Sequence, residues 1–363
     1  MGAAWMLQNW TRSVGRWLPG VHGHQIKTLA LMAWSMCCAG LCQTTIMALA
    51  APGKARVAST RRRFERWLAN SRVEVASIAV ALSKALLAHW SGQTVKLFVD
   101  ETALGPWLCC MKVSVGYRRR ALPLAWVSYV PGQLPIPQPE IVEVLLRQAG
   151  VCLPKTVEVV LMADRGLSWP LLVDLCRDLG WHYLLRVQEH TAVQRRGCRT
   201  TTMGRLASRP GQHWCGSGAV FRSAGWRITN MVACWEAGEH EPWLLITDLP
   251  PRRKRCHEYR QRMWQEEAFR DEKSHGFCWQ RSCVRQPDHA DRLLLALLLA
   301  MWMAIAAGTE LIETHRRDLV ETTARPSLSV FQLGYRWYRF IMFRHPIRSP
   351  TLWLLPLEGK SVG

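Results

Sequence analysis

Acidic residues are scarce in this 363-residue chain, which has 27 aspartates and glutamates against 47 lysines and arginines. The formal net charge is therefore +20. Such a surplus of positive charge indicates an anionic partner, with nucleic acid as the first candidate and an anionic membrane surface as the second. Hydrophobic residues make up 49% of the chain, which excludes an intrinsically disordered protein.

Metal-binding cysteine patterns are also missing. The 13 cysteines include no two pairs at zinc-ribbon spacing, so the sequence does not support a structural zinc site. Residues 1–9 carry none of the charged residues that begin a secretory signal. We therefore expect a reducing cytoplasm and free, mostly buried thiols.

Long uncharged segments are few. Residues 28–53 have no charged residue, and residues 293–309 are almost entirely apolar. The first segment is diluted by polar side chains, and the second is slightly short against the roughly 20 residues that a membrane span needs. We expect a buried helix in each case, with a membrane span as the alternative.

Positive charge gathers near the N-terminus. Residues 1–99 hold 12 lysines and arginines but only 2 acidic residues, and their hydrophobic pattern is helical. The densest part is Arg61, Arg62 and Arg63, followed closely by Phe64 and Trp67. Interleaved cations and aromatics favour a helical DNA-binding region over residues 1–92, although a solvated basic face has the same pattern.

From residue 93 onward, the hydrophobic pattern changes from helical spacing to short apolar runs. Short apolar runs predict strands at 94–99, 111–117, 122–130, 157–163 and 182–187, with helices at 139–149 and 171–179. Three successive strands followed by alternation indicate a mixed α/β sheet. We divide this part into a first core segment (93–188), a β-rich insertion (189–242), a second core segment (243–320) and a basic-aromatic C-terminal region (321–363).

Two aspartates stand directly after apolar strands. Asp100 follows Lys-Leu-Phe-Val, and Asp164 follows Val-Val-Leu-Met-Ala. Ligands of open α/β sheets collect at the carboxyl ends of strands, which makes both residues candidate site residues. Aspartate also begins many turns, so these two positions alone do not decide between a site and a turn.

A polar helix is predicted over about 256–273. At about 100° per residue, Tyr259, Arg262, Glu266 and Lys273 fall within an arc of about 60°, and Arg270 extends the same stripe. Glu266 is the only carboxylate on the stripe. A solvated face with intrahelical ion pairs is the alternative, but such a face would spread its charges more evenly.

Three carboxylates from two strand ends and one helix suit divalent metal chemistry. Mg²⁺ prefers oxygen ligands and keeps water and phosphate in its shell. Two such ions, roughly 3.5–4 Å apart, activate the attacking oxygen and stabilise the leaving oxygen in phosphodiester chemistry. The flanking Tyr259, Arg262 and Lys273 then suit phosphate binding.

This pattern resembles a known family. Tyr-x2-Arg-x3-Glu-x6-Lys over residues 259–273 has the spacing of the Tyr-Arg-Glu-Lys motif of the "IS-four" group of bacterial insertion-sequence transposases. The sequences around Asp100 (Val-Asp-Glu-Thr) and Asp164 (Ala-Asp-Arg-Gly) are similar to the other two acid motifs of these DDE transposases. The resemblance covers about residues 94–308.

The resemblance implies an RNase H-like core in which Asp100, Asp164 and Glu266 hold two Mg²⁺ or Mn²⁺ ions. It also implies a β-rich insertion before Glu266, consistent with residues 189–242. In relatives, a tryptophan before a similar strand stacks on a flipped base, and Trp243-Leu-Leu-Ile-Thr247 matches that arrangement. A base stacked on an aromatic ring gains about 1–3 kcal/mol. Trp243 as an ordinary core residue at a strand end remains the alternative.

The implied function is cut-and-paste DNA transposition. Such an enzyme binds double-stranded DNA at terminal inverted repeats and at the target, acts as a homodimer on paired ends, and works in the nucleoid rather than at a membrane. DNA contacts are then expected from Tyr259, Arg262, Lys273, Trp243, Arg270 and the triplet Arg61, Arg62 and Arg63. The alternatives are a metal-dependent nuclease that does not join strands, a non-catalytic DNA-binding protein derived from a transposase, and a basic membrane-associated protein.

Overall fold

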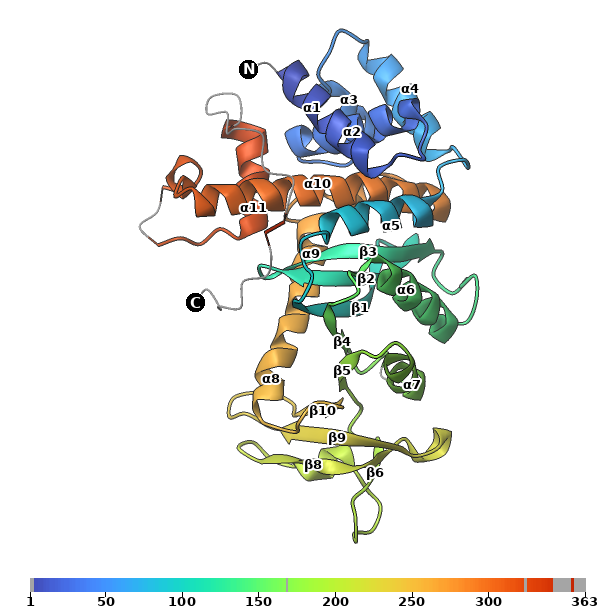
Figure 1. The fold of residues 1–363 in the computed structure, drawn as a ribbon, viewed down its shortest axis with the longest axis vertical. Coiled ribbons are helices and arrows are strands. Elements are labelled where there is room, and N and C mark those ends of the chain that lie inside the picture. Colours follow the sequence, from blue (N-terminus) through green and yellow to red (C-terminus); the bar gives the residue numbers. More distant parts are fainter. Residues whose placement is uncertain (1–2, 168, 323–324, 342–353, 356–363) are drawn as a thin grey trace.

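The computed structural model describes residues 3–167, 169–322, 325–341 and 354–355. The molecule is elongated (Figure 1), with the N-terminal helices at one end, the strands of residues 192–234 at the other, and the rest of the sheet between them.

The N-terminal region is entirely helical, as its pattern predicted. It consists of α1 (Ala3–Trp17), α2 (Gly23–Ala39), α3 (Thr44–Ala50), α4 (Val57–Leu68) and α5 (Val75–Leu86). Helix α4 is amphipathic because Phe64, Trp67 and Leu68 are buried at helical spacing, while Arg61 and Arg62 are exposed. The third arginine of the triplet, Arg63, is partly buried and donates its Nε–H to Thr28 Oγ1 of α2 at 2.9 Å.

One ten-stranded sheet runs through the molecule in the order β3-β2-β1-β4-β5-β10-β9-β8-β6-β7. Strands β1, β4 and β5 are parallel, and the other pairs are antiparallel, which confirms the predicted mixed α/β sheet. The strands are β1 (Thr94–Leu104), β2 (Leu108–Tyr117), β3 (Arg120–Tyr129), β4 (Glu158–Ala163), β5 (His182–Arg186), β6 (Ala192–Gln194), β7 (Thr201–Thr202), β8 (His213–Val220), β9 (Arg227–Cys234) and β10 (Trp243–Thr247).

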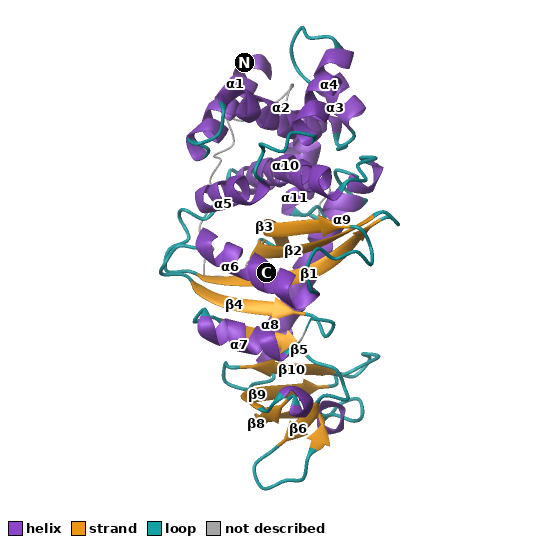
Figure 2. Ribbon diagram, turned by 90° about the vertical axis from the view of Figure 1, so that its right-hand side faces the viewer, coloured by secondary structure: helices purple, strands orange, loops and turns teal. Residues whose placement is uncertain are grey.

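Two details differ from the sequence-based prediction. Strand β1 does not end at residue 99 but continues to Leu104, because its second half pairs with β2 in an antiparallel hairpin. The insertion is β-rich, but β9 pairs with β10, so its strands extend the core sheet instead of forming a separate one (Figure 2).

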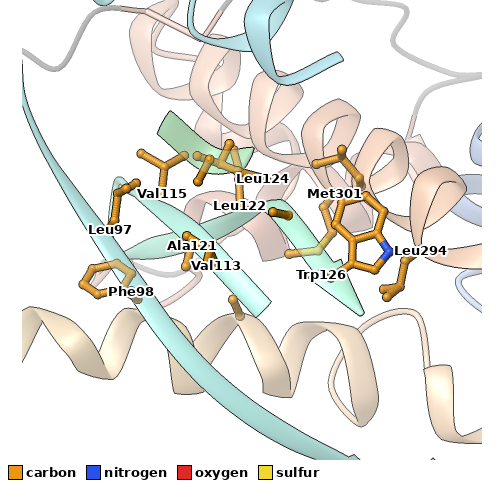
Figure 3. Close-up of a cluster of buried hydrophobic side chains, with 14 of the residues drawn as sticks. Leu97, Phe98, Val113, Val115, Ala121, Leu122, Leu124, Trp126, Leu294 and Met301 are labelled. Carbon is orange, nitrogen blue, oxygen red and sulfur yellow. The ribbon is translucent and has the colours of Figure 1, made fainter. Parts of the chain in front are cut away.

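Helices pack on the first three strands and form the main core. Helix α6 (Gln138–Cys152) contacts β2 and β3, and α10 (Pro287–Glu313) contacts β3, while α7 (Pro170–Asp178) packs beside β5. Figure 3 shows Leu294 and Met301 of α10 beside Trp126 of β3, within a cluster of apolar strand side chains. All 13 cysteines are free, and seven of them are buried, including Cys110 in this core.

Helix α10 contains the apolar segment 293–309. By length and composition it could cross a membrane, but 89% of its most apolar stretch is buried inside the protein. Helices α2 and α3, from the other uncharged segment, form a pair bent by 87° that passes the same test jointly. Because α10 packs between α2, α11 (Val330–Arg336) and β3, it serves as a core helix here.

The C-terminal basic-aromatic region is partly packed. A π-helical turn, Trp337–Ile341, follows α11, and its Trp337 and Tyr338 side chains are buried. Phe340 is exposed and has the Arg339 guanidinium over its ring. Residues 342–348, which include Phe343, Arg344 and Arg348, lie outside the described residues.

The polar helix predicted over 256–273 is interrupted. It consists of α8 (Lys254–Tyr259), a 3₁₀ turn (Arg260–Arg262) and α9 (Met263–Lys273). Residues three apart eclipse each other in a 3₁₀ turn, so Tyr259 and Arg262 are brought to the same side of the rod more closely than an unbroken α-helix would bring them.

Two buried ion pairs attach α9 to the sheet. Lys112 Nζ of β2 bonds to Glu272 Oε2, and these side chains are 0% and 1% exposed. Arg120 Nε of β3 bonds to Asp271 Oδ2 at 2.5 Å, with side chains 10% and 3% exposed. The Lys112 ammonium also lies 4.5 Å from the centre of the Trp279 ring. Asp271 and Glu272, which lie off the predicted stripe, therefore face the core, not solvent.

Replacing Glu272 by Met should leave the Lys112 ammonium buried without a counterion. We expect Glu272→Met to lower the free energy of unfolding by about 3–5 kcal/mol, and Lys112→Met/Glu272→Met to recover most of that loss. Urea unfolding followed by tryptophan fluorescence measures both. Glu143→Met on α6 is the control, because the exposed Glu143–Arg147 pair contributes at most about 1 kcal/mol. A double variant as unstable as the single one would contradict this account.

Candidate active site

The two strand aspartates lie side by side. Strands β1 and β4 run parallel, and their last paired residues are Val99 and Ala163, so Asp100 and Asp164 follow the same rung of the sheet. Each aspartate accepts a hydrogen bond on Oδ1 from the backbone N–H of the next residue, at 2.9 Å for Asp100 and 2.7 Å for Asp164. Their Oδ2 atoms face the helical segment formed by α8, the 3₁₀ turn and α9.

Arg262 joins all three predicted acids. Its guanidinium lies 2.8 Å from Asp100 Oδ2, 3.2 Å from Glu266 Oε1 and 4.0 Å from Asp164 Oδ2. The structure therefore brings Asp100, Asp164 and Glu266 together around one cation, from two strands and one helix. The Arg262 side chain is 11% exposed, whereas Asp164 and Glu266 remain 37% and 38% exposed.

Burial and neighbouring charges shift two pKa values at this cluster. Desolvation raises the pKa of Asp100 to about 6, although Arg262 acts in the opposite direction. Burial alone would lower the pKa of Arg262, but Tyr259 and the surrounding carboxylates raise it above its ordinary value. Arg262 therefore stays cationic, and burial disfavours the ionised form of Asp100.

The other residues of the stripe take different positions. Tyr259 is buried and donates its hydroxyl to the carbonyl of Ala163 at 3.0 Å, immediately before Asp164. Lys273 donates to Thr102 Oγ1 at 2.7 Å, two residues beyond Asp100 on β1. Arg270 is 57% exposed and pairs with Glu267, so it is set apart from the acid cluster.

Trp243 lies next to this stripe at the start of β10. Its ring meets the Tyr259 ring edge-on at 5.4 Å between centroids, and the Arg260 guanidinium lies 5.6 Å from its centre. The ring is half-buried and borders a shallow surface hollow, which is lined by Cys234, Glu236, Trp243, Cys256, His257 and Arg260.

The donor set suits a hard divalent cation, because three carboxylates supply only oxygen ligands. Among the described residues, however, no group of three or more histidine, cysteine or acidic side chains is arranged to hold a metal ion. The reason is visible in the distances: the three carboxylates are gathered around the Arg262 guanidinium instead of a common point between them.

Residues 139–303 match the family model described as the transposase DDE domain. This match supports a DDE transposase. It includes Asp164, Glu266 and the whole stripe, while Asp100 lies N-terminal to it, on the strand beside Asp164. No curated protein matches the chain. A DDE transposase domain is RNase H-like, and the mixed sheet with its packed helices is consistent with that fold.

Sequence reasoning missed the residues that hold this candidate site together. Lys112 and Arg120 fix α9, and Glu241 ties the insertion to the core by pairing with Arg165 at 2.7 Å and Arg186 at 2.6 Å. One signal was readable: Lys112 is the only charged residue in the apolar strand β2. A lysine in such a strand needs a buried partner.

Tyr259→Phe should separate a supporting role from a DNA contact. The change removes the donor to the Ala163 carbonyl, so we expect a loss of about 0.5–1.5 kcal/mol in the free energy of unfolding and no change in DNA affinity. Urea unfolding and gel-shift titration with a duplex measure the two effects. Weaker DNA binding at unchanged stability would instead place the hydroxyl on DNA.

Proposed function

We propose that this protein catalyses cut-and-paste DNA transposition and that it is of the "IS-four" type with the Tyr-Arg-Glu-Lys motif. The observation that carries the proposal is the convergence of Asp100, Asp164 and Glu266 on the Arg262 guanidinium, on a chain that matches the transposase DDE domain. Acids so far apart in sequence meet only because the fold brings them together.

Asp100, Asp164 and Glu266 would hold two divalent ions, Mg²⁺ or Mn²⁺. When bound, these ions lower the pKa of the attacking water or 3′-hydroxyl and neutralise charge on the leaving oxygen. The residues fit this role because they supply oxygen donors, and because the Asp164 and Glu266 side chains remain 37% and 38% exposed.

Arg262 and Lys273 would bind and orient the DNA. Arg262 and Lys273 present cations on either side of Glu266, which suits phosphate oxygens flanking the scissile bond. In the first step a water oxygen replaces the 3′-oxygen on phosphorus; in later steps the freed 3′-hydroxyl replaces another 3′-oxygen, so each step breaks one P–O bond and forms one.

We expect Trp243 to stack on an extrahelical base. Its half-buried ring borders a surface hollow and is steadied by Tyr259 and Arg260. A base stacked there recovers part of the cost of unstacking it from the duplex. The alternative, a core residue at the end of β10, predicts no such contact.

The N-terminal helices would bind the terminal inverted repeats. Helix α4 exposes Arg61, Arg62 and Arg66, whereas its Phe64 and Trp67 side chains are buried. Arg61 forms a partly exposed pair with Glu65, which a DNA phosphate can replace. This end of the molecule lies far from the insertion (Figure 1), so DNA bound there would extend along the sheet toward the acids, and paired ends would require a homodimer.

Two other functions remain in view. A metal-dependent nuclease with the same core would cut DNA without joining strands, and a non-catalytic descendant of a transposase would bind DNA without cutting it. The intact acid cluster favours catalysis over the second. A membrane-associated role is disfavoured because α10 is buried in the core, and we propose a cytoplasmic, nucleoid-associated enzyme instead.

Asp100→Asn, Asp164→Asn and Glu266→Gln should each reduce strand cleavage by at least about 100-fold, because each removes a charged metal ligand. The assay is cleavage of a labelled duplex carrying the sequences that flank the gene, in Mg²⁺. Glu267→Gln, the adjacent acid on α9, is the control and should cleave normally. Full activity in all three variants would refute the catalytic assignment, and cleavage by the wild type without joined products would favour the nuclease.

DNA binding should depend steeply on salt. If the N-terminal helices contact 6–10 phosphates, affinity should fall about 10³–10⁵-fold between 50 and 200 mM salt. Arg62→Gln should reduce the slope by about 1, because one phosphate contact is lost. Arg147→Gln on α6 is the control and should leave the slope unchanged. A flat salt response in the wild type would exclude binding dominated by phosphates.

A further inference from the structure

Arg262 occupies the point on which the three acids converge. Its guanidinium is within 4.0 Å of all of them and donates to Asp100 and Glu266 at 2.8 and 3.2 Å. No other cation among the described residues forms an ion pair with any of the three acids. The protein thus neutralises its own acid cluster with a side chain.

The contacts of Arg262 use the oxygens that a metal would need. In Asp100 and Asp164, Oδ1 already accepts the backbone N–H of the following residue, and Oδ2 is the atom that faces Arg262. A divalent ion bound by both Oδ2 atoms and by Glu266 would place a double positive charge beside the guanidinium. Two cations repel strongly at such a distance in a partly buried site, so only one of them can hold this position.

The Arg262 side chain could also move from the three acids to another anionic partner. It ends the 3₁₀ turn that separates α8 from α9, and a 3₁₀ stretch inside a helical rod often marks a hinge. A guanidinium binds phosphate at least as well as carboxylate, in the same forked geometry. A DNA strand arriving at the exposed side of Asp164 and Glu266 would offer such a phosphate within reach of this side chain.

We propose that Arg262 is a resident cation that closes the acid cluster until DNA arrives, and that a DNA phosphate draws it away so that divalent metal and DNA bind cooperatively. This inference rests on the proposed transposase function and adds a regulatory step to it. Thermodynamic linkage requires that DNA strengthen metal binding by the same factor by which metal strengthens DNA binding. The enzyme would then carry metal, and be able to cut, mainly where DNA is present.

Mn²⁺ binding tests the coupling without relying on catalysis. Free Mn²⁺ is measured by electron paramagnetic resonance during titration of the wild type, Arg262→Gln and Arg147→Gln, each with and without a duplex carrying the flanking sequences. The Asp100→Asn/Glu266→Gln protein provides the background of Mn²⁺ bound to DNA and to other surface acids. Arg147 is a matched control because it forms an i,i+4 pair with Glu143, as Arg262 does with Glu266, but on helix α6, which carries none of the three acids.

In the wild type we expect the duplex to strengthen Mn²⁺ binding by about 5- to 150-fold, the usual range of coupling between sites. Arg262→Gln should bind Mn²⁺ tightly without the duplex and gain little from it, and Arg147→Gln should behave like the wild type. Equal Mn²⁺ affinity of the wild type with and without duplex would overturn the inference, and so would weaker duplex-free binding by Arg262→Gln than by the wild type.

The failure of this inference and the failure of the proposed function give different results. If the wild type binds no more Mn²⁺ than the Asp100→Asn/Glu266→Gln protein under either condition, the acid cluster is not a metal site. That result would refute both the proposed function and this inference. If Arg262→Gln does not fold, Arg262→Lys replaces it: a lysine keeps the charge but cannot reach three carboxylates with one planar group. Coupling should then be reduced but present, and coupling as large as in the wild type would count against the inference.

Discussion

The buried contact between Lys112 and Glu272 is the constraint on which the site depends. It joins the middle of β2 to the last turn of α9, and neither side chain reaches solvent. With the Arg120–Asp271 pair beside it, the contact fixes both the position and the rotation of α9 on the sheet. Glu266 lies six residues earlier, about 9 Å along the helix, so a rigid helix transmits this placement directly to the acid cluster.

Electrostatic repulsion among the three carboxylates makes the acid cluster unfavourable for the folded chain. Three carboxylates surround a single guanidinium, and desolvation raises the pKa of Asp100 to about 6. Such crowding is destabilising for the folded chain but is what a cation-binding site requires. The buried ion pairs of Asp271 and Glu272, at the other end of α9, hold the helix in place against that repulsion. The firmly packed end of the helix is therefore adjacent to the end that carries Glu266.

Much of the local structure was readable from patterns. The strands and helices of the first core segment were predicted in the right order, because buried strands and amphipathic helices leave clear hydrophobic periodicities. The extension of β1 past Asp100 was not readable, since it depends on pairing with β2. The 3₁₀ turn at residues 260–262 was also missed, because nothing in its composition distinguishes it from α-helix.

The sequence by itself determined the elements of this protein and the spacing of its stripe, in which Tyr259, Arg262, Glu266 and Lys273 recur at helical intervals. Only the tertiary structure decided which distant partner each group takes: Arg262 with Asp100 and Asp164, Lys112 with Glu272, and Tyr259 with the Ala163 carbonyl. The physical reason is one of range. Helical and strand periodicity act over a few residues, whereas these contacts join positions that are 96 to 162 residues apart and depend on the register of the whole sheet.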